Sequence, residues 1–140
     1  ANRRPSLDLR LSAMALLVNV PLFQNLETSV LEAIASVLKP RFVLPGEKVI
    51  RKGEKGLEMY FVASGALEVT LPGQKQILGS GDFFGELALL TQSTRTADVT
   101  ALGFCELLVM TADDFTNLLS RNSDLNAHFN ETARVHLARG

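Results

Sequence analysis

The sequence predicts one α+β domain in which helices frame a central β region. At 140 residues the chain has the size of a single domain. Apolar residues recur at helical spacing near both ends, whereas short β-prone runs divided by glycine fill the middle. We therefore expect a single domain over residues 1–140, with N-terminal helices in 1–40, a β region in 41–111 and two C-terminal helices in 112–140.

Two helical patterns are expected before residue 41. The first places four apolar side chains at i, i+4, i+7 and i+11, on one helix face: Leu7, Leu11, Met14 and Val18. Pro21 then interrupts, because proline disfavours the helical conformation in the residue before it. The second pattern begins at a capping box formed by Ser29 and Glu32 and stops at Lys39–Pro40.

Short β-prone runs follow, with turn residues such as Pro45-Gly46 and Pro72-Gly73 between them. Within Leu67–Leu71 apolar and polar residues alternate, which is the period of a half-buried strand. Many short strands at this close spacing predict a sandwich, a jelly roll or a barrel. The predicted strands are Phe42–Leu44, Lys48–Arg51, Met59–Val62, Leu67–Leu71, Lys75–Leu78, Ala97–Leu102 and Phe104–Met110.

Helical patterning returns after residue 111. Thr111 and Asp114 have the spacing of a capping box, with aspartate in place of the usual glutamate. The second helix of this region is expected to carry one apolar stripe: Leu125, Phe129, Ala133 and either His136 or Leu137.

Composition and charge exclude several function classes. The formal net charge is −1 and the pI is about 6.1, so no overall positive field attracts nucleic acid or anionic lipid. One cysteine, Cys105, permits neither an intramolecular disulfide nor a multi-cysteine metal site, and its apolar neighbours predict a packed thiol. No Ser/His/Asp or Cys/His arrangement is evident, so we expect no enzyme, no catalytic residues and no metal.

No membrane-spanning or targeting segment is predicted. The longest apolar run near the N-terminus, residues 13–18, is too short for a membrane span and lacks a signal-peptide cleavage pattern. Because the chain begins with Ala1 rather than methionine, we expect it to be a piece of a longer protein.

The segment 81–90 differs from the predicted strands around it. It is rich in helix formers from Gly85 onward, but a helix this short needs support from its surroundings. Its first N–H groups, around Leu87 and Ala88, would point toward an anion placed at its start. Gly85 would let a ligand approach the backbone closely, because it has no Cβ.

Two charged residues complete this pattern. Arg95 is the only positive charge within residues 76–120, and a guanidinium beside a helix N-terminus would neutralise a cyclic phosphodiester. Glu86 would be repelled by a phosphate unless it faces a donor such as a neighbouring ribose 2′-hydroxyl. The residues alone leave other interpretations open: Arg95 as a solvated loop charge, Glu86 as a partner of its helix dipole, and Gly85 as a turn residue.

The same segment resembles the phosphate-binding cassette of cyclic nucleotide-binding domains. The cassette is expected over 83–97, and its matching residues are Phe84–Leu90 followed by Arg95–Ala97. The resemblance implies an antiparallel β-roll, a jelly-roll-like barrel with a short phosphate-binding helix. One position departs from the family pattern: Thr94 stands where proline is common, which implies a looser loop with the role of Arg95 retained. The flanks that also resemble this family are Val20–Leu26, Leu44–Glu47, Gly53–Glu54, Met59–Val62 and Ser64–Gly65.

Position by position, the resemblance implies a site for cAMP or cGMP, with no other cofactor. Arg95 would bind the exocyclic phosphate oxygens, and Glu86 would accept a hydrogen bond from the ribose 2′-hydroxyl. Gly85, Leu87 and Ala88 would offer backbone groups around the cyclic phosphate and the ribose.

Two further parts of the site follow from the resemblance. Thr96 holds the position whose hydroxyl can touch the phosphate and, in cGMP-preferring relatives, the guanine amino group. The last helix would act as a lid, with Arg134 or His136 stacked on the purine. The alternative for His136 is a place on the helix surface or in the core stripe. The sequence does not choose between cAMP and cGMP.

The prediction that results is a regulatory sensor whose terminal helices repack when the nucleotide binds and so gate an attached effector. The elbow within Val20–Leu26 resembles channel-associated members, so we expect an upstream transmembrane channel similar to cyclic-nucleotide-gated potassium channels. The chain itself would then be cytoplasmic, with no membrane insertion and no nucleic-acid binding. The alternative is the sensor of a catabolite-activator-type transcription regulator that lacks its DNA-binding part.

Overall fold

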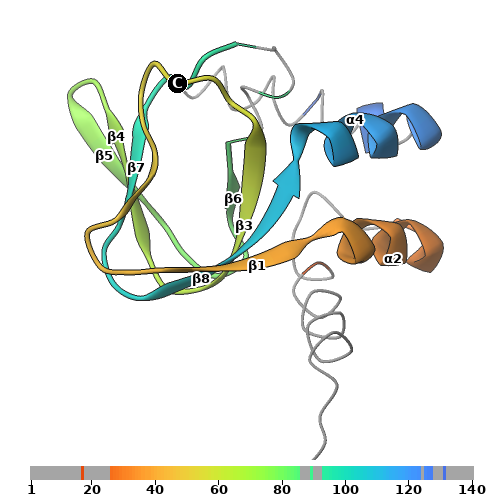
Figure 1. The fold of residues 1–140 in the computed structure, drawn as a ribbon, viewed down its shortest axis with the longest axis horizontal. Helices are drawn as coiled ribbons and strands as arrows, with labels where there is room; N and C mark the ends of the chain where they lie inside the picture. Colours follow the sequence, from red (N-terminus) through yellow and green to blue (C-terminus); the bar gives the residue numbers. More distant parts are fainter. Residues whose placement is uncertain are drawn as a thin grey trace, which may run out of the picture.

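The computed structural model describes residues 26–85 and 93–123, together with Leu17, Leu89, residues 125–127 and Glu131. Two β-sheets face each other across a shared core, and two helices lie side by side against the outer face of one sheet (Figure 1). Within these described residues, no helix combines the length and hydropathy that crossing a membrane requires.

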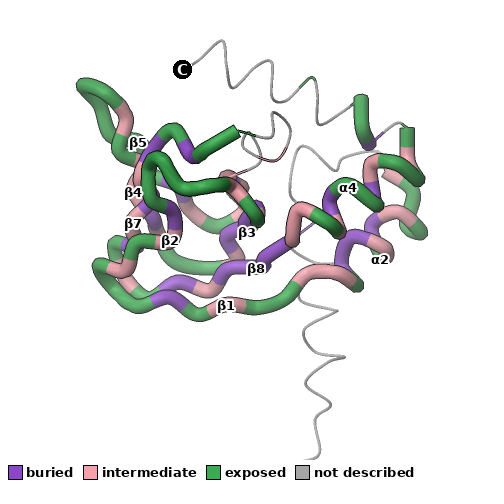
Figure 2. Tube along the Cα trace, turned by 45° about the horizontal axis from the view of Figure 1, so that its top comes forward, coloured by how far each residue is buried: buried purple, intermediate pink, exposed green. Residues whose placement is uncertain are grey.

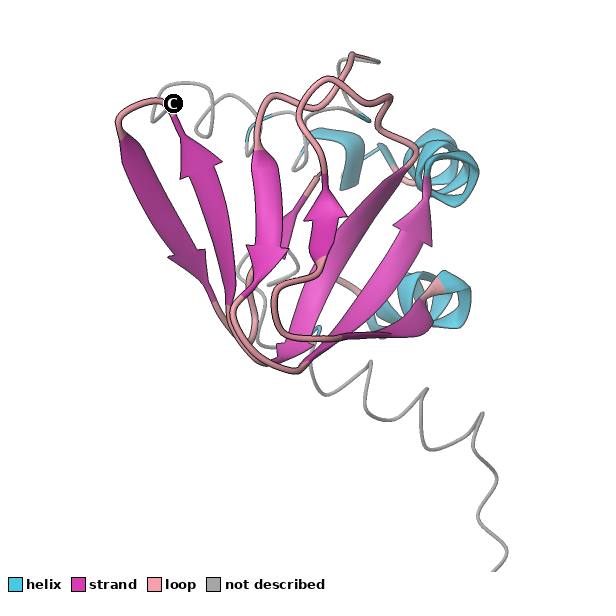
Figure 3. Ribbon diagram, turned by 60° about the vertical axis from the view of Figure 1, so that its left-hand side comes forward, coloured by secondary structure: helices cyan, strands magenta, loops and turns pink. Residues whose placement is uncertain are grey.

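Among the described residues, each sheet has four strands, and every pairing between strands is antiparallel (Figure 3). The first sheet has the order β1-β8-β3-β6, with bounds β1 Lys39–Val43, β8 Cys105–Thr111, β3 Glu58–Ser64 and β6 Phe83–Phe84. The second has the order β2-β7-β4-β5, with bounds β2 Lys48–Ile50, β7 Asp98–Ala101, β4 Leu67–Leu71 and β5 Gln74–Leu78. The predicted α+β fold with an antiparallel β-roll is confirmed, although pairing among the described strands gives two sheets rather than one closed barrel.

The strands β3 and β8 are buried on both faces (Figure 2). Successive side chains of a strand point to opposite faces, so each strand contributes to two cores. In β3, Tyr60 and Val62 lie in the core between the sheets, whereas Met59 and Phe61 lie in the core beneath the helices. Both strands are therefore almost continuously apolar, unlike the half-buried β4.

The helices cover the outer face of β3 and β8. Helix α2 spans Thr28–Val37, and helix α4 spans Ala112–Arg121. The capping prediction for α4 is confirmed, because Thr111 is its N-cap and its side chain accepts a hydrogen bond from the Asp114 N–H (3.3 Å). Residues of both helices share the helix-side core: Leu31, Ile34, Ala35, Phe115 and Leu118.

The capping box predicted for α2 is wrong. The N-cap of this helix is Glu27, and its side chain makes no capping hydrogen bond. The Glu27 carbonyl instead accepts from Val30 N (3.0 Å) and Leu31 N (3.1 Å), so the N-cap lies two residues before the predicted one and Ser29 lies in the first turn of the helix.

Two strand assignments also differ from the prediction. Strand β1 begins at Lys39 and includes Pro40, which an edge strand tolerates because its outward side needs no donor. Phe83–Phe84 forms the short strand β6, although this segment was not expected to be extended. The pairing with Tyr60 and Phe61 of β3 decides this conformation, and Gly85 directly after it has φ +88° and is not helical.

The remaining predictions concern single residues. Cys105 is a buried thiol, as expected, and its Sγ lies 3.3 Å from the Ala66 carbonyl oxygen. Leu125, the first residue of the predicted C-terminal stripe, is fully buried in the helix-side core, as is Leu17, which was not part of the predicted N-terminal stripe. The other residues of the two predicted terminal stripes lie outside the described residues: Leu7, Leu11, Met14, Val18, Phe129, Ala133, His136 and Leu137.

Candidate ligand-binding site

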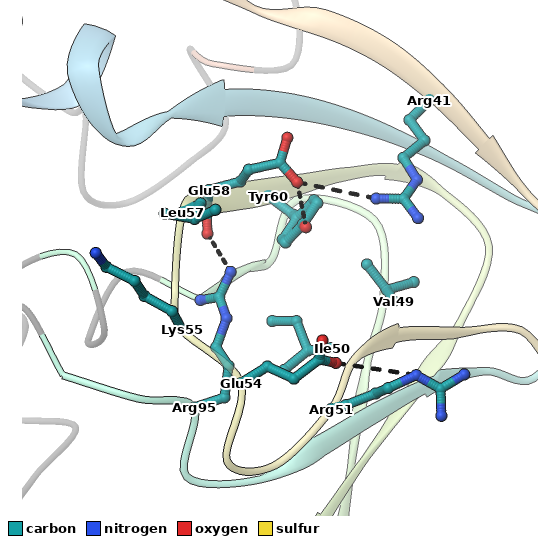
Figure 4. A pocket seen from close by; sticks show the side chains of 10 residues that line it. All are labelled: Arg41, Val49, Ile50, Arg51, Glu54, Lys55, Leu57, Glu58, Tyr60 and Arg95. Carbon is teal, nitrogen blue, oxygen red and sulfur yellow. Dashed lines mark hydrogen bonds and ion pairs between the residues drawn. The ribbon is translucent and has the colours of Figure 1, made fainter.

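A cavity of about 170 Å³ opens between β1, the β2–β3 connection and the start of β3 (Figure 4). This volume is below the ~300–1,000 Å³ of usual small-molecule sites, so these residues enclose only part of a ligand the size of a nucleotide. Among the described residues, the lining carries four cationic side chains and two carboxylates, a net charge of +2 that favours an anion. The lining residues are Arg41, Val49, Ile50, Arg51, Glu54, Lys55, Leu57, Glu58, Tyr60 and Arg95.

Arg95 is the buried charge of this cavity, with 8% of its surface exposed. Its Nη1 donates to the Gly85 carbonyl oxygen (2.8 Å), and its Nη2 donates to the Glu58 carbonyl oxygen (2.6 Å). These two carbonyls come from different segments and hold the planar guanidinium from two sides. The interpretation of Arg95 as a solvated loop charge is therefore wrong.

The main chain of Arg95 is fixed as well. Arg95 N donates to the Glu54 carbonyl oxygen (2.7 Å), and Gly53 N donates to the Arg95 carbonyl oxygen (2.9 Å). An isolated β-bridge joins Lys55 to Thr94. The loop between β2 and β3 thus pairs with the residues around Arg95, although about forty positions separate them in the sequence.

Gly85 adopts a conformation that few other residues tolerate, with φ +88°. A Cβ at this position would lie 3.0 Å from Arg95 Nη1 and 3.2 Å from the Glu58 carbonyl oxygen. The interpretation of this glycine as a turn residue is confirmed by its φ, whereas the approach of a ligand to it stays a prediction. The group that approaches it in this structure is the arginine.

A polar network borders the cavity beside Arg95. The Tyr60 hydroxyl donates to Glu58 Oε1 (2.8 Å), and Arg41 Nη1 lies 4.0 Å from the same oxygen. Arg41 also reaches Glu47 Oε2 at 3.5 Å. Burial, followed by the hydrogen bond and the negative charge of Glu58, raises the pKa of Tyr60 to about 12, so its hydroxyl remains a proton donor.

The structure brings only part of the predicted site together. Arg95 lines the cavity, Gly85 contacts the Arg95 guanidinium, and Thr96 is exposed beside it. Five predicted site residues lie outside the described residues: Glu86, Leu87, Ala88, Arg134 and His136.

Of the ten lining residues, only Arg95 was predicted as a site residue. The other nine include the three of the polar network beside it: Arg41, Glu58 and Tyr60. Because successive side chains of a strand point to opposite faces, the sequence could have placed positions 58 and 60 on one face of β3. Nothing local in the sequence indicated that this face meets Arg95.

The sequence profile described as the cyclic nucleotide-binding domain matches residues 40–122, more than half of the chain. The chain belongs to the cyclic nucleotide-binding domain family. The match covers the β-roll, the cavity and α4.

Channels are prominent among the relatives of this domain. It is 39% identical over 118 residues to a cyclic nucleotide-gated potassium channel of Rhizobium etli, which covers 84% of this chain and 33% of the channel. It is 34% identical over 125 residues to the potassium/sodium hyperpolarization-activated cyclic nucleotide-gated channel 2 of Homo sapiens, which covers 89% of this chain and 14% of that one. The domain therefore spans a third or less of the length of these relatives.

Solved structures support the same fold. The regulatory domain of Toxoplasma gondii PKA, crystallised with cAMP, superposes with a TM-score of 0.80 at 25% identity, over 91% of this chain and 51% of that one. A second PKA regulatory domain structure, bound to the cAMP analogue Sp-2Cl-cAMPS, gives a TM-score of 0.76 at 24% identity, over 96% of this chain and 95% of that one. This domain thus shares its fold with regulatory domains of PKA.

Proposed function

We propose that this domain binds a cyclic nucleotide, cAMP or cGMP, with the cyclic phosphate at Arg95. It acts as a regulatory sensor and catalyses no reaction. The names of its relatives support this ligand class, because they describe nucleotide-gated channels and regulatory domains bound to cAMP or to an analogue of it.

The observation that carries the proposal is the buried guanidinium beside a cavity of net positive charge. A buried charge is costly, and folds retain one where it is paired or where it binds a ligand. Two carbonyl oxygens orient this guanidinium, which lines the cavity. A phosphodiester anion in the cavity accepts charge-assisted hydrogen bonds from a guanidinium, and these are stronger than hydrogen bonds to neutral oxygens.

The other roles in the site follow the family pattern. Glu86 accepts a hydrogen bond from the ribose 2′-hydroxyl, while Gly85, Leu87 and Ala88 contribute backbone groups. The Thr96 hydroxyl contacts the phosphate. The lid comes from the last helix, where Arg134 or His136 stacks on the purine.

The effector that we propose is a transmembrane channel. This domain matches only 33% of one channel relative and 14% of the other, which supports its attachment to a longer channel protein. The upstream position of the channel follows from the resemblance of Val20–Leu26 to channel-associated members. The domain, taken as residues 1–140, then lies on the cytoplasmic side and transmits nucleotide occupancy through its terminal helices. Binding can shift these helices only by as much as the nucleotide prefers one arrangement over the other.

Calorimetric titration with cAMP and with cGMP tests the site, using Arg95→Ala. Removal of a desolvated charge partner costs about 2–5 kcal/mol, or roughly 30-fold to several thousand-fold in affinity. Arg121→Ala is the matched control, because it removes an exposed arginine from the end of α4, outside the cavity lining. Binding of neither nucleotide by the unaltered domain would refute the function, and equal affinity in Arg95→Ala would refute the site.

A further inference from the structure

Two carbonyl oxygens accept hydrogen bonds from the Arg95 guanidinium, and the Tyr60 side chain contacts the chain at or next to each of them. The first carbonyl belongs to Glu58, and the Tyr60 hydroxyl donates to the carboxylate of this same residue at 2.8 Å (Figure 4). The second belongs to Gly85, which directly follows Phe84. The Tyr60 and Phe84 rings stack with centroids 4.9 Å apart and planes 20° apart.

Each of these contacts restrains a different segment. Tyr60 and Phe84 are opposite each other in the β3–β6 pairing, so the stacked rings fix β6 and the glycine turn that follows it. The hydroxyl bond fixes the first residue of β3, where the chain leaves the β2–β3 connection. Tyr60 thus lies between the two segments that supply the acceptors of Arg95.

The environment of Tyr60 makes this arrangement rigid. The residue is 3% exposed, and a buried hydroxyl that loses its acceptor carries the full cost of its desolvation. Its acceptor is an ionised carboxylate, which gives a stronger hydrogen bond than a neutral oxygen does. Arg41, 4.0 Å from the same carboxylate oxygen, restrains Glu58 from the other side.

We propose that Tyr60 is a positioning residue: it holds the Glu58 and Gly85 carbonyls so that the Arg95 guanidinium faces the ligand before the ligand arrives. This inference rests on the proposed binding of a cyclic phosphate at Arg95. Preorganisation of this kind raises affinity, because the cost of orienting the side chain is met on folding rather than on binding.

The test is a double-mutant cycle with cAMP and cGMP as probes. Tyr60→Phe keeps the stacked ring and deletes only the hydroxyl, so the domain should still fold, with a moderate loss of thermal stability because one buried hydrogen bond to a carboxylate is lost. Its affinity should fall roughly three- to tenfold, the size of one lost hydrogen bond. In an Arg95→Lys background, where no planar guanidinium is left to orient, the same change should lower affinity less than about twofold.

Glu47→Gln is the matched control. It removes a carboxylate from the same polar network, 3.5 Å from Arg41, without touching the bond between Tyr60 and Glu58. Its affinity should stay within about twofold of the unaltered domain.

The outcomes separate the two proposals. Absence of binding by the unaltered domain would remove the proposed function and, with it, this role for Tyr60. If that domain binds but Tyr60→Phe loses nothing, or loses equally in both backgrounds, only the positioning role is overturned. An equal loss in Glu47→Gln would also overturn it, because the effect would then belong to the whole charge network.

Discussion

Replacement of Gly85 by alanine tests the geometry around Arg95 through the glycine that its guanidinium contacts, rather than through the arginine itself. The glycine has φ +88°, and a left-handed backbone costs a residue with a Cβ about 1–2 kcal/mol. The new Cβ would lie 3.0 Å from Arg95 Nη1 and 3.2 Å from the Glu58 carbonyl oxygen. Crowding of this kind costs ~1 kcal/mol or more, so the free energy of unfolding should fall by about 2–4 kcal/mol. Each kcal/mol lowers the Tm by roughly 3–5 °C in a domain of this size.

Two other glycines supply the controls. Gly46 has φ +83°, but no atom lies within 4 Å of the position that a Cβ would take, so Gly46→Ala carries the backbone cost alone, about 1–2 kcal/mol. Gly79→Ala carries neither cost and should change stability by less than about 0.5 kcal/mol. Urea unfolding followed by circular dichroism measures all three variants.

Nucleotide affinity separates crowding from strain. Only Gly85→Ala displaces the guanidinium, so it alone should weaken cAMP binding, by roughly tenfold, or one lost hydrogen bond. If Gly85→Ala and Gly46→Ala had the same free energy of unfolding and the same affinity for cAMP, the close approach of Arg95 to this turn would contribute to neither, and the reasoning would be refuted.

The remaining predictions concern pH. Asp98 accepts hydrogen bonds from Lys52 N (2.7 Å) and Lys48 Nζ (3.3 Å), which hold its pKa below 3.8. Because the folded-state pKa is the lower one, this stabilisation is present above about pH 4 and is lost as the pH falls further. Acid should therefore destabilise Asp98→Asn less than the unaltered domain in urea unfolding at about pH 7 and about pH 3. Tyr60 is the only tyrosine, with its pKa raised to about 12. Its contribution to stability is complete below about pH 10 and is lost as the pH rises through about 12. The ultraviolet absorbance of tyrosinate follows this titration directly, and a midpoint near the ordinary value of about 10 in the folded domain would contradict the buried hydrogen bond.

Much of the β-roll was predictable because its strands are short and turn residues in the sequence indicate where they end. Turn glycines and prolines delimit the runs, and alternation within Leu67–Leu71 reports a half-buried strand. The two errors in strand assignment occur where pairing with a neighbouring strand outweighs the local preference of the residues for another conformation. Phe83–Phe84 is extended because β3 offers it a partner, and Pro40 enters a strand because that strand is at the edge.

The candidate site residues were predicted mainly from the resemblance to a known family and less from the chemistry of the residues themselves. Spacing alone left Arg95 open as a solvated charge, because burial depends on contacts with residues far away in the sequence, such as Glu58 and Glu54. Alternation places Tyr60 on the same face of β3 as Glu58, but the cavity on that face, the bond to Glu58 and the stacking on Phe84 require the folded chain.

Strand β3 separates the cavity from the helices by the thickness of one pleated layer. Tyr60 faces the cavity, while its neighbours Met59 and Phe61 lie in the core that α2 and α4 share. If the nucleotide binds in this cavity as proposed, a displacement of β3 would therefore reach the packing of both helices directly. The same strand lines the cavity and packs against the helices. Substitutions in the helix-side core could therefore change how the helices respond to the nucleotide without contacting it.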